Sequence, residues 1–67
     1  MDSFKNRLKE VRTEREFSQA KLADLLFVSQ ATIAKWETGD REPDFEMLKK
    51  LCKELEVSSD YLLGLVD

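Results

Sequence analysis

Three small groups of residues in this chain have the types and spacing for chemistry. Ser18-Gln19-Ala20-Lys21 has the Ser-x-x-Lys spacing of enzymes that form an acyl-serine. The stretch from Gln30 to Lys35 carries amide, methyl and ammonium groups of the kind that contact base edges in the major groove of DNA. The third group consists of carboxylates that alternate like calcium ligands: Asp40, Glu42, Asp44 and Glu46.

The first and third groups have simpler explanations. Nothing else from the acyl-serine mechanism accompanies Ser18, and a serine at this place is expected to cap the following helix. A calcium loop from Asp40 needs glycine at its sixth position and glutamate at its twelfth, where Phe45 and Leu51 stand. We therefore expect no catalytic residue and no metal site, and we expect the acidic residues to stabilise a helix N-terminus.

Composition narrows the function classes further. The 67 residues include no histidine and one cysteine, Cys52, which excludes disulfide frameworks, zinc sites and Cys–His or Ser–His nucleophiles. The longest apolar run is Leu25–Val28, too short to cross a membrane. We expect one domain over residues 1–67, without cofactor or membrane partner, in the cytoplasm, with Cys52 as a small buried hydrophobe.

Apolar residues recur at helical spacing in five segments. In the first segment, Phe4, Leu8 and Val11 stand at i, i+4 and i+7. Two glycines and one proline leave few turn residues for a sheet, so the fold class is predicted to be all-α. The predicted helices cover about residues 2–15, 19–26, 30–38, 44–55 and 59–65.

Capping residues set these boundaries. Serines at positions 18, 29 and 58 are predicted N-caps, Gly39 suits the end of the third helix, and Pro43 suits the first turn of the fourth. The second and third helices are separated only by residues 27–29. Two short amphipathic helices across so tight a link must cross steeply, which predicts a helix-turn-helix arrangement.

The third helix has an unusual outer face. Ile33, Trp36 and Glu37 share the inner side, with Trp36 expected in the core, whereas the opposite side carries Gln30, Ala31, Ala34 and Lys35. An outer helix face usually does no more than contact solvent, but such a face would normally carry more Glu and Lys. Short neutral side chains allow close approach to another surface. Glutamine bonds adenine, methyl groups contact thymine, and lysine reaches guanine or phosphate.

The stretch from Ser18 to Gly39, with Ser18-Gln19-Ala20-Lys21-Leu22-Ala23 and Val28-Ser29-Gln30-Ala31-Thr32-Ile33-Ala34-Lys35-Trp36-Glu37-Thr38-Gly39, resembles the core of the lambda-repressor-like (Cro/Xre-type) helix-turn-helix family of bacterial and phage regulators. The resemblance continues through 41–43 and 57–64. It implies a compact five-helix DNA-binding domain without enzymatic activity.

The resemblance also implies residue roles. Gln30, Ala31 and Lys35 match base-reading positions. Arg12 and Glu37 match a salt bridge that ties the first helix to the end of the third, which is a structural role. The glutamine Gln19 matches one that contacts a phosphate and braces the recognition helix. The positions implied to lie at the DNA backbone are Gln19, Ser29, Thr32, Thr38, Gly39 and Arg41.

Two positions depart from the family pattern. Relatives favour glycine where this chain has Phe27, after the second helix, and Glu56, after the fourth. A left-handed backbone at a non-glycine residue costs about 1–2 kcal/mol. Either the backbone takes another route at these positions, or the strain is tolerated.

The predicted function is a sequence-specific regulator of transcription, a repressor that binds a palindromic operator as a dimer with half-sites about 34 Å apart. The dimer contact is expected near the C-terminus, where an apolar patch would include Leu62, Leu63, Leu65 and Val66, unless these residues simply close the core. Alternatives are an antitoxin that also binds a toxin, and a module that binds only proteins.

The net charge of −3 does not argue against DNA, because it is unevenly distributed. The acidic excess belongs to the chain after residue 38, which we expect to lie away from the DNA face. A neutral face with few cations predicts a shallow dependence of DNA affinity on salt.

Overall fold

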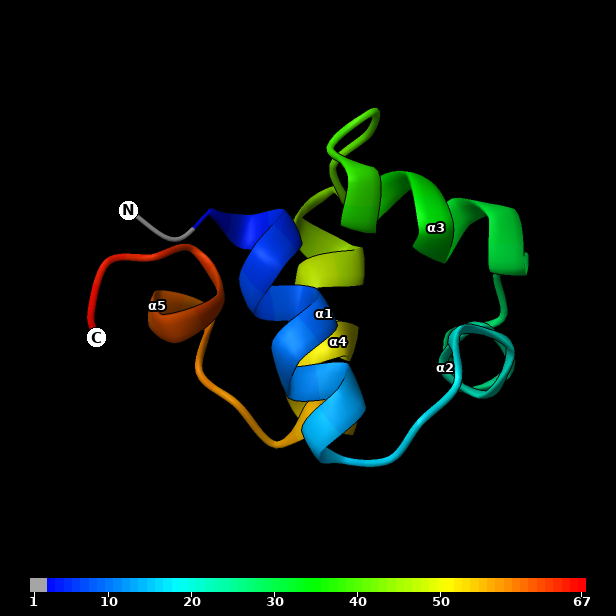
Figure 1. The fold of residues 1–67 in the computed structure, drawn as a ribbon, viewed down its shortest axis with the longest axis horizontal. Helices are drawn as coiled ribbons and strands as arrows, with labels where there is room; N and C mark the ends of the chain where they lie inside the picture. Colours follow the sequence, from blue (N-terminus) through cyan, green and yellow to red (C-terminus); the bar gives the residue numbers. More distant parts are fainter. Residues whose placement is uncertain (1–2) are drawn as a thin grey trace.

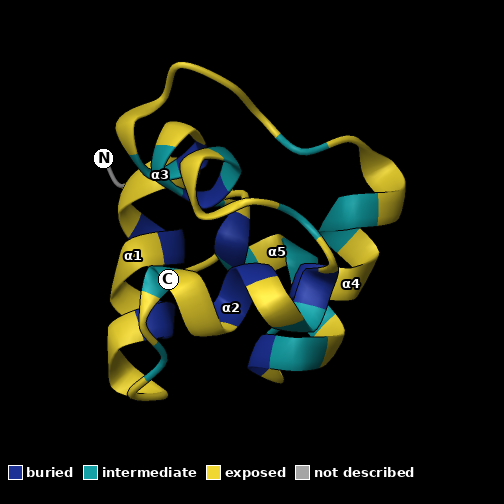
Figure 2. Cartoon of the chain, turned by 90° about the vertical axis from the view of Figure 1, so that its right-hand side faces the viewer, coloured by how far each residue is buried: buried dark blue, intermediate teal, exposed yellow. Residues whose placement is uncertain are grey.

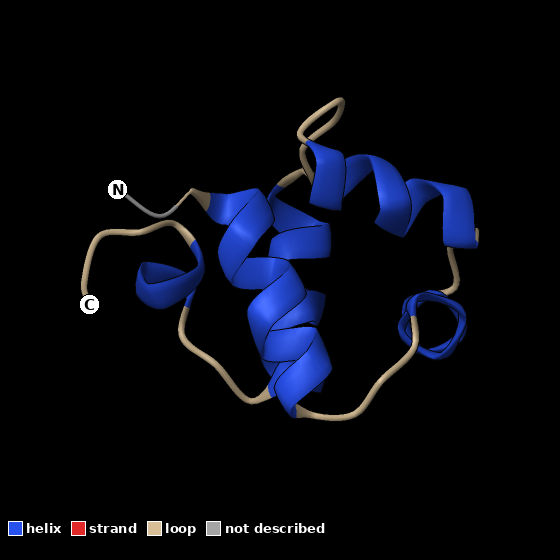
Figure 3. Cartoon of the chain, viewed as in Figure 1, coloured by secondary structure: helices blue, strands red, loops and turns tan. Residues whose placement is uncertain are grey.

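Residues 3–67 are described by a computed structural model, and within them the chain forms five helices and no strand (Figures 1 and 3). The helices are α1 (Phe4–Glu14), α2 (Gln19–Leu26), α3 (Gln30–Thr38), α4 (Phe45–Leu55) and α5 (Ser59–Leu62). None of these helices is both long and apolar enough to cross a membrane.

The bounds of α2 and α3 are those expected, and the other helices differ at their ends. The predicted start of the first helix at Asp2 lies outside the described residues, and α1 ends one residue earlier than expected. Helix α4 begins one residue later than expected because Asp44 is its N-cap, accepting a hydrogen bond from the Met47 amide at 2.9 Å. Pro43 therefore precedes the cap, so its predicted place in the first helical turn is wrong.

The three predicted serine caps are present. Ser18 accepts a hydrogen bond from the Lys21 amide at 3.0 Å, and Ser58 accepts one from the Tyr61 amide at 3.1 Å. Ser29 does the same for the amide of Thr32 at 3.2 Å. Ser18 and Ser58 each satisfy an amide of the first helical turn, whereas the Thr32 amide also bonds the Ser29 carbonyl at 3.1 Å. The starts of α2, α3 and α5 are thus fixed locally.

The backbone does adopt the left-handed conformation at Phe27 (φ 60°) and Glu56 (φ 53°), so the strain is tolerated there. The end of α2 shows how. The Val28 amide bonds the Ala23 carbonyl at 3.0 Å, and the Phe27 amide bonds the Asp24 carbonyl at 3.3 Å. This is the Schellman pattern, which satisfies carbonyls at the helix end.

The end of α1 has the same geometry, which was not predicted from the sequence. Glu16 has φ 61°, and the Phe17 amide bonds the Arg12 carbonyl at 3.1 Å. In all three helix ends, the residue after the left-handed position packs against the core: Phe17, Val28 and Val57. This burial, together with the closing hydrogen bonds, offsets the strain.

Helix α5 ends at Leu62, earlier than the expected residue 65. Gly64 takes φ 78°, and the Leu65 amide bonds the Asp60 carbonyl at 2.9 Å. This closing turn reverses the chain immediately after the helix. As a result Leu65 and the residues after it leave the helix axis.

The core is formed by one residue set drawn from all five helices. Helix α1 packs against α3 and α5, while α2 packs against α3 and α4. In Figure 1, α2 is seen end-on and α3 lies across the view, so the two cross steeply, as predicted for a helix-turn-helix. Figure 2 shows the buried residues of each helix in dark blue. The core residues are Leu8, Val11, Leu22, Ala23, Leu26, Ile33, Trp36, Leu51, Leu55 and Leu62.

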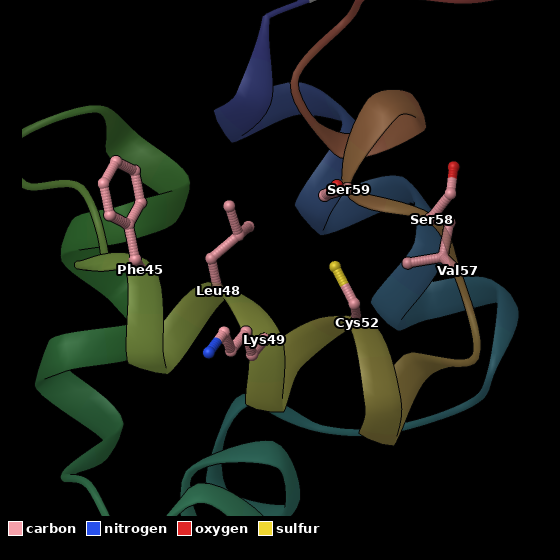
Figure 4. Close-up of a pocket in the computed structure, with 7 residues that line it drawn as sticks. All are labelled: Phe45, Leu48, Lys49, Cys52, Val57, Ser58 and Ser59. Atoms are coloured by element: carbon pink, nitrogen blue, oxygen red, sulfur yellow. The ribbon is translucent and has the colours of Figure 1, made fainter.

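Cys52 packs against the core but is half-buried, not buried as predicted. Its side chain points from α4 toward the segment with Val57 and Ser59, where it lines a hollow of about 440 Å³ (Figure 4). Burial raises the pKa of the Cys52 thiol above its ordinary value, which keeps it protonated at neutral pH.

Candidate nucleic-acid interface

Helix α3 lies across one end of the molecule, at the top of Figure 1. Its inner side buries Ile33 and Trp36 in the core. On the other side, Gln30, Ala31 and Lys35 are exposed, as expected for residues that contact another molecule. The three predicted base-reading positions therefore occupy one accessible helix face.

This face is held in place by a buried ion pair. Arg12 of α1 donates from Nε to Glu37 Oε2 at 2.5 Å and from Nη2 to Glu37 Oε1 at 3.1 Å. Its Nη1 donates to the Phe17 carbonyl at 2.8 Å. The side chains of Arg12 and Glu37 are only 10% and 4% exposed. A two-pronged arginine–carboxylate pair fixes both angle and distance, so it ties α3 to α1.

The ion pair continues into a hydrogen-bond chain that reaches the exposed face. Gln19, the first residue of α2, donates from Nε2 to Glu37 Oε1 at 3.1 Å. Gln30 donates from its own Nε2 to Gln19 Oε1 at 3.4 Å. This hydrogen bond orients the side-chain amide group of Gln30, and with it the direction in which the Gln30 amide oxygen points. Gln19 and Gln30, assigned separately from the sequence, thus lie in contact.

The N-terminal end of α3 carries two hydroxyls that bond each other. Ser29 Oγ lies 3.0 Å from Thr32 Oγ1 and also accepts the Thr32 amide. One hydroxyl hydrogen of the pair remains available to an acceptor such as a phosphate oxygen. The exposed Ser29 and half-buried Thr32 thus stand together at the positive end of the helix dipole.

The C-terminal end of α3 is closed by Gly39, whose φ is 87°. The Lys35 carbonyl accepts the amides of Gly39 at 3.1 Å and Arg41 at 3.3 Å, and the Thr38 hydroxyl at 3.2 Å. This carbonyl therefore organises the whole turn, and Thr38, Gly39 and Arg41 are all exposed.

A polar hollow of about 360 Å³ lies beside this turn and brings Lys35 and Arg41 to one place. Glu42 lines the same hollow. The expectation that the acidic residues lie away from the candidate face is therefore wrong for Glu42, because the loop after α3 folds back beside the helix.

Two basic residues of α1, Lys5 and Arg7, make contacts that were not predicted from the sequence. Lys5 lies against Gly39 across the end of α3, although it comes from the first turn of α1. Arg7 is buried and donates from Nη1 to the carbonyls of Tyr61, at 2.9 Å, and Val66. Neither residue belongs to a motif, and only the folded chain brings them to these partners.

The C-terminal apolar patch is smaller than predicted. Leu62 is fully buried in the core, so its assignment to an exposed contact is wrong. Leu63, Leu65 and Val66 are exposed, and Leu65 is 70% exposed. Because Arg7 binds the Val66 carbonyl, these side chains project from a tethered backbone.

A sequence model described as helix-turn-helix matches residues 8–62 of the chain. The SPbeta prophage-derived uncharacterized HTH-type transcriptional regulator YonR of Bacillus subtilis (strain 168) is 43% identical over 60 residues, 90% of this chain and 56% of that protein. The HTH-type transcriptional activator BcrR of Enterococcus faecalis is 40% identical over 61 residues, 91% of this chain and 30% of that protein. The chain thus spans about half or less of the length of these relatives.

The fold is also similar to that of a solved repressor. The P22 c2 repressor, in a crystal structure with synthetic operator 9T, superposes with a TM-score of 0.89 at 35% identity. The match covers 94% of this chain and 96% of that one.

Proposed function

Because the chain belongs to the helix-turn-helix family, we propose that it is a sequence-specific regulator of transcription that inserts α3 into the major groove of double-stranded DNA. The observation that carries the proposal is the hydrogen bond from Gln30 to Gln19, which orients the Gln30 amide on the exposed face of α3. The similarity to a repressor solved in complex with a synthetic operator supports DNA as the ligand. No chemical step is involved, so binding itself is the activity.

Each of three side chains of α3 contacts a different base edge. The Gln30 amide pairs with an adenine, which presents an acceptor and a donor side by side. The Ala31 methyl contacts a thymine methyl, and Lys35 bonds a guanine. Short side chains at the N-terminal half of α3 let the helix axis approach the groove closely.

Two groups of residues position the protein on the DNA backbone. Ser29, Thr32 and Gln19 offer donors at the N-terminal end of α3, where the helix dipole also favours a phosphate. At the C-terminal end of α3, Arg41 and the turn at Thr38 and Gly39 contact the DNA backbone. Contacts at both ends hold the helix in register while the bases are read.

We propose a symmetric dimer as the form that represses. The largest extent of the chain is 28 Å, less than one turn of DNA, so one copy covers a single half-site. Leu63, Leu65 and Val66 form the contact, joined by Phe45, which is 83% exposed and lines a hollow of about 180 Å³ with Leu63. An apolar patch of this kind on an ordered backbone gains stability when a second copy covers it.

The dimer is tested by sedimentation at high micromolar concentration. We expect the wild type to associate and the Leu65→Glu variant to remain monomeric and bind a palindrome more weakly. Phe27→Ser is the matched control, because Phe27 is also exposed but lies at the end of α2. A wild type that stays monomeric would refute the proposed contact.

Base reading is tested by titrating a promoter palindrome with the wild type and with Gln30→Ala and Lys35→Ala. Each variant should lose about 1–3 kcal/mol of binding free energy, with a loss that depends on the base opposite the changed side chain. Lys53→Ala, in the last turn of α4, is the control for removing an exposed lysine. Wild-type binding by both α3 variants would show that this face does not read DNA.

A further inference from the structure

Lys5 and Gly39 approach each other closely at the C-terminal end of α3. A Cβ atom placed on Gly39 would lie 3.1 Å from Lys5 Cδ and 3.6 Å from Lys5 Nζ. The lysine stem therefore lies along the glycine, and its ammonium group stands beside the turn that ends α3. Any larger residue at position 39 would have to displace this side chain.

The same place is hollowed and bordered by a second cation. Lys5, Gly39 and Arg41 line a depression of about 100 Å³, together with Ser3, Phe4, Trp36 and Glu42. Arg41 also lines the larger hollow that contains Lys35. Two adjoining depressions thus place three cations, from α1, from α3 and from the following loop, around one end of the recognition helix.

We propose that Lys5 and Arg41 together bind one phosphate group of the DNA backbone across Gly39, so that α1 contributes directly to the interface. This rests on the proposed function and adds a residue from outside the helix-turn-helix. The last carbonyls of α3 carry a partial negative charge, which would repel a phosphate. A pair of cations is needed to overcome that repulsion, and the glycine leaves the space for the Lys5 stem to lie against the turn.

Lys5 also has a purely structural interpretation. An ammonium group near the C-terminal end of a helix stabilises that helix by interaction with its dipole. The two roles differ in what they change. Loss of a structural interaction lowers the melting temperature, whereas loss of a phosphate contact lowers DNA affinity on every sequence and weakens its dependence on salt.

Glu42 lies in both depressions and opposes the bound phosphate. In the free protein this carboxylate lines the same depressions as the cations and weakens their attraction for an anion. When DNA binds, Glu42 must be kept from the phosphate, so the proposal predicts that Glu42→Gln binds DNA more tightly than the wild type.

The test is the salt dependence of DNA affinity between about 50 and 200 mM salt for the wild type, Lys5→Gln and the control Lys53→Gln. The control removes a lysine from the C-terminal end of α4, which lies at the opposite side of the molecule from α3 (Figure 1). Lys5→Gln should bind both palindromic and unrelated DNA more weakly. The slope of log affinity against log salt concentration should become shallower by about one for Lys5→Gln. The loss of affinity of this variant relative to the wild type should therefore be about threefold smaller at the high end of this salt range than at the low end.

The outcomes separate the two proposals. If the wild type shows no salt-dependent DNA affinity, the proposed function fails. If the wild type binds and Lys5→Gln keeps the wild-type slope, or loses only thermal stability, the role of Lys5 is refuted while the function stands. Unchanged affinity of Glu42→Gln would likewise show that the phosphate does not occupy these depressions.

Discussion

The buried pair of Arg12 and Glu37 gives the sharpest prediction about what holds α3 in place. Replacing Glu37 by glutamine removes the charge while keeping the size of the side chain. Arg12 would then keep its charge at a site where its side chain is only 10% exposed. The amide oxygen of the new glutamine would replace only one of the two carboxylate oxygens that now accept hydrogen bonds from Arg12.

The expected loss is large for so small a change. Breaking one partner of a buried pair costs about 3–5 kcal/mol. Because the introduced glutamine would retain one acceptor, we expect the lower end, about 3 kcal/mol in the free energy of unfolding. For a domain of this size that corresponds to a fall in melting temperature of roughly 12–24 °C. The whole stability of such a chain is only about 3–10 kcal/mol, so the loss removes about a third of it or more.

The assay is urea denaturation followed by circular dichroism, with Glu46→Gln as matched control. Glu46 pairs with Lys49 at 3.5 Å, but both side chains are at least 75% exposed. An exposed pair of this kind contributes under about 0.5 kcal/mol. A Glu37→Gln variant no less stable than Glu46→Gln would refute the argument from burial. The double change Arg12→Met with Glu37→Met should be less destabilising than either single change, because no unpaired charge remains.

Further changes test the strained helix ends and the hydrogen bond between Tyr61 of α5 and Glu10 of α1. Phe27→Gly should stabilise the protein by up to about 1 kcal/mol in denaturant unfolding, because relief of the left-handed strain exceeds the added flexibility of the unfolded chain. Gly39→Ala should lower stability by about 1–2 kcal/mol in the same assay. The hydrogen bond that Tyr61 donates to Glu10 raises the pKa of the Tyr61 phenol above its ordinary value of 10.0. Its contribution is present below about pH 10 and lost at higher pH, so wild-type stability should fall more steeply in that alkaline range than that of Tyr61→Phe. Equal alkaline profiles would contradict the role of that bond.

The helix boundaries could be predicted because their signals are local. A serine cap acts on an amide three residues later, so the starts of α2, α3 and α5 follow from short stretches of sequence. The helix ends carry a pattern as well, since a left-handed residue, an apolar residue and a serine follow one another three times: Glu16-Phe17-Ser18, Phe27-Val28-Ser29 and Glu56-Val57-Ser58. The conformation of Glu16 could have been predicted from this repetition, but the signal was not used.

The contacts that complete the candidate site could not be predicted in the same way. The bond between Gln19 and Gln30 depends on the crossing of α2 and α3, and the contact of Lys5 with Gly39 depends on how α1 packs across the end of α3. Periodicity places a residue on a face but does not state what that face meets. For the same reason Leu62 was assigned to the surface, although α5 turns it into the core.

The central claim is that the outer face of α3 reads DNA bases, and selection from a pool of randomised DNA duplexes tests it most directly. We predict that the wild type enriches a two-fold symmetric sequence. Gln30→Ala should enrich the same sequence with relaxed choice at one base pair in each half-site. If no sequence is enriched, or if both proteins select with the same stringency at every position, the account of this face is contradicted.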